Sequence, residues 1–329
     1  MKSSYPKISI VTPSFNQGAF IEQTILSVLN QNYPNLEYII MDGGSTDNTI
    51  EIIKKYDSKI SFWSSEKDHG QTDAINKGFQ KTTGDIFNWL NSDDYLEPLI
   101  LFKIAEIFQK KPFLEVLCGR EWLFEDKIPE NRILSEGSIL FEKVSDTLRI
   151  GIIDQPCTYF KKSAIEKYFP LNDSLKYVMD KELWWKYLLE NGQDKILKSN
   201  LIISNFRLHS LSKSILEGQS KFELEEKLLK KSLFKYIKFE KVIIDYLNVK
   251  GDLEINWYLD NDIVKPLKKS YLIQFINESY VEKNEMKMEQ LSKIYLKFFL
   301  VPQLIIVKII AYLYLPKFLI NKIWKVKLK

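Results

Sequence analysis

The chain has 329 residues, of which 45% are hydrophobic and 27% are charged, and its formal net charge is +4. This length allows one large domain or about two smaller ones, and the composition excludes a disordered or fibrous chain. The chain has only two cysteines, Cys118 and Cys157, which excludes a disulfide framework and predicts a reducing, cytoplasmic setting.

Strand and helix patterns alternate over the first third of the chain. Residues 1–7 are polar and lead directly into a strand, so we expect no secretory signal. Apolar, β-branched runs predict strands at residues 7–12, 37–41, 60–64 and 85–90. Helical spacing predicts helices at residues 19–29, 47–56, 71–81 and 98–110. This alternation predicts an α/β fold with a mostly parallel sheet flanked by helices.

Beyond residue 111 the alternation becomes less regular. Strand-like pieces occur near residues 114–117, 158–160 and 196–206, and helical pieces near 163–168 and 181–190. After about residue 220 the chain is rich in Lys, Glu and Leu and is predicted to be helical. We therefore expect one domain over residues 1–218 and a helical C-terminal region over residues 219–329.

Polar loops follow each of the first four predicted strands. They comprise residues 12–16, Asp42 with the glycines after it, residues 66–73 and residues 91–94. In an open α/β sheet these loops share the edge where ligands bind. Asp93 and Asp94 directly follow a buried strand, and two adjacent carboxylates need water or a cation. The sequence therefore predicts a metal site in a cleft, although single aspartates at strand ends are usually caps.

Several short motifs then resemble the family 2 glycosyltransferases, which have the Rossmann-like GT-A fold. They are Pro-Ser-Phe-Asn at residues 13–16, Asp-Gly-Gly-Ser-Thr-Asp at 42–47 and Asn-Ser-Asp-Asp at 91–94, supported by residues 76–78 and 83–85. The resemblance covers about residues 7–214. It implies transfer of a sugar from a nucleotide-diphosphate donor to an acceptor hydroxyl, with inversion. The Gln-x-x-Arg-Trp motif of processive members is absent, which favours transfer of a single sugar.

The resemblance also implies which residues bind the donor. Main-chain groups of the first loop would line the nucleoside pocket, Asp42 would accept a hydrogen bond from the base, and the later loops would meet the phosphates. Asp42 as a cap before Gly43 and Gly44, and Lys77 as a solvated helix residue, are the alternatives. The implied donor-binding residues are Thr12, Pro13, Ser14, Phe15, Asn16, Asp42, Asp68, Gly70, Lys77, Asn91, Ser92 and Asp94.

A divalent metal, Mn²⁺ or Mg²⁺, is expected to neutralise the leaving diphosphate. The Asp-x-Asp motif of the family corresponds to residues 91–93, so Asp93 is the implied metal ligand. Asn91 replaces the first aspartate, which removes one charge from the metal site. His209 would complete the metal shell or contact the diphosphate, and Lys213 would cover the diphosphate.

Inversion requires a general base that takes the proton of the acceptor hydroxyl. The family places an aspartate before a helix here, which implies Asp180 as the base, with Glu182 as the next candidate. Asp180 as a simple helix cap is the alternative. Trp184 and Trp185 suit either the core or a sugar platform. Residues 154–156 are predicted to face the acceptor.

The basic character of the chain is confined to its end. Residues 293–329 contain eight lysines and no acidic residue, so the preceding 292 residues carry a net charge of −4, which argues against a nucleic-acid partner. The apolar run at residues 298–315 is interrupted by Pro302, Gln303 and Lys308. A peripheral amphipathic segment on the inner membrane leaflet is therefore favoured over a packed helical hairpin or a true span.

These features together predict a cytoplasmic, peripheral enzyme that uses a nucleotide-sugar, with a UDP-sugar favoured. Its expected acceptor is a surface glycan or a lipid-linked glycan precursor. A nucleotidyltransferase is the enzymatic rival, but residues 12–16 lack the basic, glycine-rich phosphate loop expected of one. No Gly-x-Gly-x-x-Gly follows the first strand, which disfavours a dinucleotide-binding oxidoreductase. A non-catalytic nucleotide-sugar-binding or scaffold protein is the other rival.

Overall fold

A computed structural model describes residues 5–126, 128–210, 212 and 218–299. Contacts between Cα atoms divide the chain into two compact units. The first comprises residues 1–140 and 151–259, and the second comprises residues 141–150 and 260–329. Residues 219–259 thus group with the sheet, while the predicted boundary after residue 218 stays a prediction.

The first half of the sheet is parallel. Its strands lie in the order β3-β2-β1-β4, and each pair of neighbours runs in the same direction. These strands are β1 (Ile8–Ser14), β2 (Leu36–Asp42), β3 (Phe62–Ser65) and β4 (Ile86–Trp89), and the helices between them are α1 (Ile21–Leu29), α2 (Thr49–Lys55) and α3 (Gln71–Lys81). All seven elements fall where the sequence patterns predict them, within two residues or so at each end. The carboxyl ends of β1, β2 and β4 therefore lie side by side.

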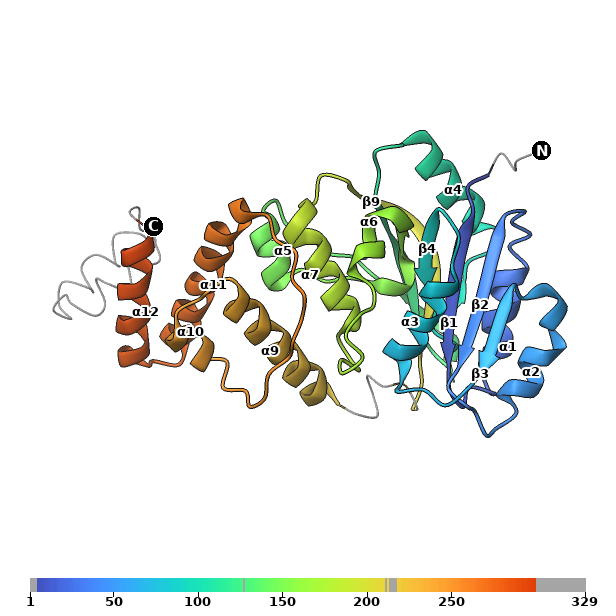
Figure 1. The fold of residues 1–329 in the computed structure, drawn as a ribbon, viewed down its shortest axis with the longest axis horizontal. Coiled ribbons are helices and arrows are strands. Elements are labelled where there is room, and N and C mark those ends of the chain that lie inside the picture. The colour runs from blue at the N-terminus through green and yellow to red at the C-terminus, as the bar shows by residue number, and fades with distance from the viewer. Residues whose placement is uncertain (1–4, 127, 211, 213–217, 300–329) are drawn as a thin grey trace. The chain divides into compact units, whose positions relative to one another are not determined.

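Helices cover both faces of this parallel half (Figure 1). Ile8 and Ile10 of β1 belong to the core that contains the apolar stripes of α1 and α2. The opposite face carries Val11, against which Gly78 of α3 packs so closely that an added Cβ would lie 2.4 Å from Val11 Cγ1. Because successive side chains of a strand point to opposite faces, this alternation holds the strand ends in one fixed register.

The second half of the sheet is mixed. Strand β8 pairs antiparallel with β4 and with β6, and β6 pairs parallel with β9 over its length. Its elements are β5 (Tyr95–Leu96), α4 (Ile100–Lys110), β6 (Val116–Glu125), β7 (Ile128–Leu134), β8 (Thr158–Lys161), α6 (Lys162–Ile165), α7 (Met179–Asn191) and β9 (Ile196–Leu208). Parallel pairs still hold most of the paired residues, so the predicted mostly parallel α/β sheet is confirmed.

The C-terminal region is helical, as predicted. Helices α9 (Gln219–Tyr236) and α10 (Lys241–Asp245) belong to the first unit. The second unit contains α5 (Val144–Ile150), α11 (Asn261–Val281) and α12 (Glu285–Phe298). Within it, Arg149 Nε and Asp146 Oδ1 both bond Ser270 Oγ, at 2.7 Å each.

Within the described ranges, no helix has the length and apolar character needed to cross a bilayer. Residues 300–329, which include most of the predicted membrane-binding tail, lie outside the described residues. The prediction of peripheral membrane binding therefore stays a prediction.

A buried carboxylate ties β2 to the strands beside it. Glu37 accepts bonds from Ser9 Oγ at 2.5 Å and from Thr83 N at 2.6 Å, and its Oε1 lies 2.6 Å from Lys7 Nζ. Burial alone raises the pKa of Glu37, but the bonds from Lys7, Ser9 and Thr83 outweigh it and lower the pKa from 4.5 to about 2. The folded state therefore prefers the ionised form of Glu37.

We predict that Glu37→Gln lowers the free energy of unfolding by roughly 2–3 kcal/mol at pH 7. Because the folded pKa lies below the unfolded one, this stabilisation is present above about pH 4.5 and is lost as the pH falls toward about 2. Urea titrations at several pH values would measure it, with the exposed Glu51→Gln as the control. A pH-independent difference between wild type and Glu37→Gln would contradict this account.

Candidate active site

The first two strand ends are joined by hydrogen bonds between their loops. Thr12, Pro13 and Ser14 end β1 and pair in register with the end of β2. Asn16 N donates to Ser45 Oγ at 2.7 Å, and Asn16 Oδ1 accepts from Thr46 N at 2.8 Å. The side chain of Phe15, which lies between Ser14 and Asn16 in the sequence, is 58% exposed. The structure thus brings the predicted nucleoside-binding loop and the loop after Asp42 together.

Asp42 is buried at the end of β2 and binds its own loop. Its Oδ2 accepts from Gly44 N at 3.1 Å, from Ser45 N at 2.9 Å and from Ser65 Oγ at 2.6 Å. Its Oδ1 accepts from Ser45 Oγ at 2.5 Å. This is the capping alternative that the sequence allowed, and a bond from Asp42 to a nucleoside base stays a prediction. An ionised carboxylate offers about four acceptor sites, so the loop and Ser65 of β3 together satisfy this one.

The third loop places Asp68 beside the glycines of the second. A Cβ added to Gly43 would lie 2.9 Å from Asp68 Oδ2, and Asp68 Oδ1 accepts from Gly70 N at 2.8 Å. Burial is the main cause that raises the pKa of Asp68. Lys77 pairs with Asp73 at 2.9 Å on α3, and its side chain is 40% exposed. Asp68 and Gly70 therefore line the same edge, with Lys77 about two turns into the helix.

The two carboxylates after β4 face different surroundings. Asp93 Oδ2 lies 3.0 Å from His209 Nε2, and the Asp93 side chain is 21% exposed. Asp94 is 1% exposed, and it accepts from Arg207 N at 3.0 Å and from Asn91 Nδ2 at 3.0 Å. Burial, followed by the charge of Asp93, raises the pKa of Asp94 well above its usual value. Asp93 is thus the accessible carboxylate, and Asp94 supports the turn from inside.

The turn itself is anchored on both sides. Thr24 of α1 donates to Ser92 O at 3.0 Å and to Asp94 O at 2.6 Å. Asn91 Oδ1 accepts from Gln71 Nε2 at 2.8 Å, so Asn91 links the start of α3 to the turn. An aspartate in place of Asn91 would add a charge beside the buried Asp94, which explains how an amide fits this position.

Arg207 of β9 is a residue at this site that the sequence analysis did not single out. Its Nε donates to Asp93 O at 2.9 Å, and its terminal nitrogens bond Asp126 and Gln23. Its guanidinium carbon lies 5.0 Å from the ring centre of Phe20 and 4.9 Å from that of Phe124. Arginine is rarely buried without such partners, and the polar residues along β9 give no local sign that this one is.

Asp93 and His209 together suit a divalent cation. A carboxylate oxygen and an imidazole nitrogen are common ligands of Mn²⁺ and related ions. His209 is 8% exposed, its ring lies 4.3 Å from that of Phe20, and its Nδ1 is buried without a hydrogen-bond partner within the described residues. No cluster of three or more His, Cys, Asp or Glu side chains suited to a metal exists among the described residues. These two residues therefore fit a metal whose remaining ligands would come from a substrate or water. Lys213 lies outside the described residues.

The predicted base lies at the start of α7. Asp180 is the second residue of this helix and is partly buried, and burial raises the pKa of its carboxyl group. Its Oδ1 accepts only the neighbouring Lys181 N, at 2.8 Å, among the bonds described. A raised pKa brings a carboxylate closer to the range that suits a general base.

Glu182, the second candidate for the base, already has two hydrogen-bonding partners. It is 1% exposed, its Oε1 lies 2.6 Å from Lys186 Nζ, and its Oε2 accepts from Asn172 N at 2.9 Å. Trp184 and Trp185 are 1% and 3% exposed and pack among aromatic neighbours. The structure therefore places these tryptophans in the core, and it places Glu182 in a buried ion pair.

The predicted acceptor-facing residues contact the β4 strand end. Gln155 Nε2 donates to Asn88 Oδ1 at 2.8 Å and to Trp89 O at 2.7 Å. Burial raises the pKa of Asp154, and burial together with Asp154 raises the pKa of nearby Glu121 to about 8. Glu121 is a buried acid that the sequence analysis did not single out.

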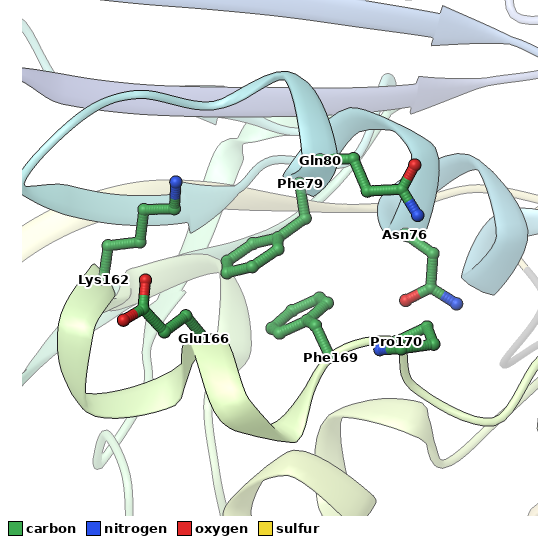
Figure 2. Close-up of a pocket in the computed structure, with 7 residues that line it drawn as sticks. All are labelled: Asn76, Phe79, Gln80, Lys162, Glu166, Phe169 and Pro170. Carbon is green, nitrogen blue, oxygen red and sulfur yellow. The ribbon is translucent and has the colours of Figure 1, made fainter.

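A separate pocket of about 260 Å³ opens beside the second half of α3. Figure 2 shows the rings of Phe79 and Phe169 within it, and they stack with centroids 3.6 Å apart. None of the residues predicted to bind the donor lines this pocket, whose lining residues are Asn76, Phe79, Gln80, Lys162, Glu166, Phe169 and Pro170.

Comparison with known proteins identifies the family that the chain resembles. The sequence profile described as Glycosyl transferase family 2 matches residues 9–169, which contain the first four strands and their loops. An uncharacterised glycosyltransferase of Rickettsia typhi is 30% identical over 188 residues, which is 56% of this chain and 59% of that relative. The chain therefore spans less than two thirds of that relative's length.

Two solved structures share the fold. TarS 1–349 of S. aureus, solved in complex with UDP, has a TM-score of 0.56 and 15% identity, over 87% of this chain and 77% of that chain. The mannosyltransferase PcManGT of Pyrobaculum calidifontis, solved with GDP-Man and Mn²⁺, has a TM-score of 0.50 and 14% identity, over 98% of this chain and 84% of that chain. The likeness to glycosyltransferase structures confirms the predicted GT-A fold.

We predict that Arg207→Lys weakens both folding and the Asp93 turn. A lysine cannot bond Asp93 O, Asp126 and Gln23 at once or stack between two rings, so we expect a loss of roughly 2–4 kcal/mol in unfolding free energy. Thermal denaturation with and without Mn²⁺ would measure it. The matched control is Arg149→Lys, whose guanidinium bonds Asp146 and Ser270. Equal effects of Mn²⁺ on wild type and Arg207→Lys would argue against a role in shaping the turn.

Proposed function

The chain belongs to glycosyltransferase family 2, and on that premise we propose that it is an inverting enzyme that transfers one sugar from a nucleotide-diphosphate-sugar to an acceptor hydroxyl. The observation that carries the proposal is the pairing of Asp93 and His209, 3.0 Å apart, beside the loops that follow β1 and β2. A donor held by those loops would present its diphosphate to that pair. The expected product is a surface glycan or a lipid-linked glycan precursor.

The donor would lie across the strand ends, with its nucleoside beside Thr12, Pro13 and Ser14 and its phosphates near Asp93. UDP is the favoured nucleotide, which agrees with the UDP bound to TarS, whereas PcManGT was solved with GDP-Man. Asp68, whose raised pKa reflects burial beside Gly43, would offer a carboxylate at the same edge of the sheet. The saturated Asp42 would act by shaping the loop of Gly43 and Gly44.

Asp93 and His209 would hold a divalent metal, Mn²⁺ or Mg²⁺. When bound, the metal neutralises the negative charge of the departing nucleoside diphosphate. Arg207 and Asp94 contribute by fixing the turn from behind, since the amide of Arg207 bonds Asp94 and its guanidinium bonds Asp93 O. His209 meets Asp93 from a strand end of the second half of the sheet.

Asp180 would take the proton of the acceptor hydroxyl as that oxygen attacks the anomeric carbon from the face opposite the leaving group. Its partly buried position supports this role, because burial raises its pKa toward that of an effective base. We assign the role to Asp180 rather than Glu182 because Glu182 is held by Lys186 and Asn172. Binding to the cytoplasmic face of the membrane through residues 293–329 would bring a lipid-linked acceptor close.

We predict that Asp180→Asn lowers kcat by about 100-fold or more while donor binding is retained, because the amide cannot accept a proton. Release of nucleoside diphosphate from a panel of nucleotide-sugars would measure turnover. Asp173→Asn, an exposed aspartate of the same segment, is the matched control. Turnover of Asp180→Asn at the wild-type rate would refute the assignment of the base.

We also predict a metal-dependent thermal shift with one nucleoside diphosphate among UDP, GDP and dTDP, with CMP as a comparison. Binding to the native state adds about 2.7 kcal/mol of stability at a hundredfold excess over Kd. Asp93→Ala should lose the Mn²⁺-dependent part of that shift, whereas Asp57→Ala, at a surface turn, should keep it. No shift with any nucleotide would remove the donor site from this edge of the sheet.

A further inference from the structure

Three successive main-chain N–H groups just before α7 converge on one carboxylate of another helix. Glu225 of α9 accepts from Lys176 N at 2.9 Å, from Tyr177 N at 2.8 Å and from Val178 N at 3.3 Å. Consecutive N–H groups that point to one spot form an anion-binding concavity, and a carboxylate satisfies it with charge-assisted bonds. The segment that precedes Asp180 is therefore held by Glu225, which lies 47 to 49 residues further along the sequence.

The same segment also touches the donor side of the sheet. Thr72 Oγ1 at the start of α3 donates to Leu175 O at 2.5 Å. Lys176 Nζ donates to His69 O at 2.9 Å, and it lies 3.6 Å from where a Cβ of Gly70 would be. Residues 175–178 thus link the third donor-side loop to the first turn of α7.

A second bond joins α9 to the first turn of α7. Lys181 Nζ lies 2.7 Å from Glu226 Oε2, and Lys181 directly follows Asp180. The two adjacent glutamates of α9 therefore contact both sides of Asp180, Glu225 through the main chain before it and Glu226 through the side chain after it.

We propose that Glu225 is a positioning residue that holds Asp180 in its working orientation, by binding the three N–H groups of residues 176–178. This inference rests on the proposed function, since it requires Asp180 to be the base. It gives α9, in the region predicted to be a separate C-terminal part, an indirect role in the reaction, through Asp180. Orientation of a catalytic group contributes strongly to rate because small misplacements are costly.

The chemistry of the contact requires an acid at position 225. Glu225 Oε2 accepts from all three N–H groups, and Oε1 also accepts from Lys176 N. A glutamine with its oxygen in place of Oε2 lacks the negative charge and turns its amide nitrogen, itself a donor, toward Lys176 N. Glu225→Gln therefore keeps the size of the side chain but removes the charge that the N–H groups bind. Glu225→Asp keeps the charge, but its shorter side chain places the carboxylate farther from those N–H groups.

The test compares these two variants with wild type and with Glu223→Gln, an exposed glutamate of the same helix, in the full-length protein. We expect kcat of Glu225→Gln to fall by about tenfold or more, with a smaller fall for Glu225→Asp and none for Glu223→Gln. The Mn²⁺-dependent thermal shift with the nucleoside diphosphate that stabilises wild type should persist in all of them. The acidic limb of the kcat pH profile should move to lower pH, because a released Asp180 becomes more solvated.

Two results would overturn the inference. An unchanged kcat and pH profile in Glu225→Gln, alongside an inactive Asp180→Asn, would show that the contact does not serve the base. Loss of the nucleotide-dependent thermal shift in Glu225→Asp would show that Glu225 supports the fold of the donor site and not only the orientation of Asp180. Activity in Asp180→Asn would instead refute the proposed function itself, so the two failures are distinguishable.

Discussion

The contact between Arg207 and the Asp93–Asp94 turn joins the two halves of the sheet at the site. Strand β4 belongs to the parallel half, and β9 belongs to the mixed half, where it pairs with β6 and β5. Arg207 bonds Asp93 through its side chain and Asp94 through its amide, and Phe20 and Phe124 enclose its guanidinium. A buried guanidinium is stable only with such partners, so its position dictates where the accessible carboxylate of Asp93 points.

The parallel half could be predicted closely from the sequence because its signals are local. Each strand is a short apolar run, and each ends in turn residues such as Gly43 and Gly44 that interrupt the pattern. The shared edge then follows from the geometry of parallel strands, which is why the loops containing Asn16, Asp68 and Asp93 could be assigned to one site from sequence alone. Helix α3 was predicted to the residue, and it begins directly after Gly70.

The remaining features depend on partners that are distant in sequence. The spacing of Glu182 and Lys186 predicts that they pair on a helix, but nothing near them predicts that the pair is buried or that Asn172 N completes it. The saturation of Asp42 depends partly on Ser65, from the next strand, and the role of Arg207 depends on Gln23, which is 184 residues away. In the sequence, Glu225 is one of several acids on a charged helix. Its contact with residues 176–178 is evident only from the structure. Sequence patterns report which face of an element is buried, but not which polar groups meet there.

The separation between Asp93 and His209 has a consequence for the newly made chain. The two residues are 116 positions apart. A protein emerges from the ribosome from its N-terminus, so the loops after β1 and β2 are exposed well before the imidazole of His209, which completes the pair, and the guanidinium of Arg207. A nascent or prematurely terminated chain that ends before β9 has the parallel strands but only one of the two proposed metal ligands. The order of the chain thus delays completion of the site until the second half of the sheet has been synthesised.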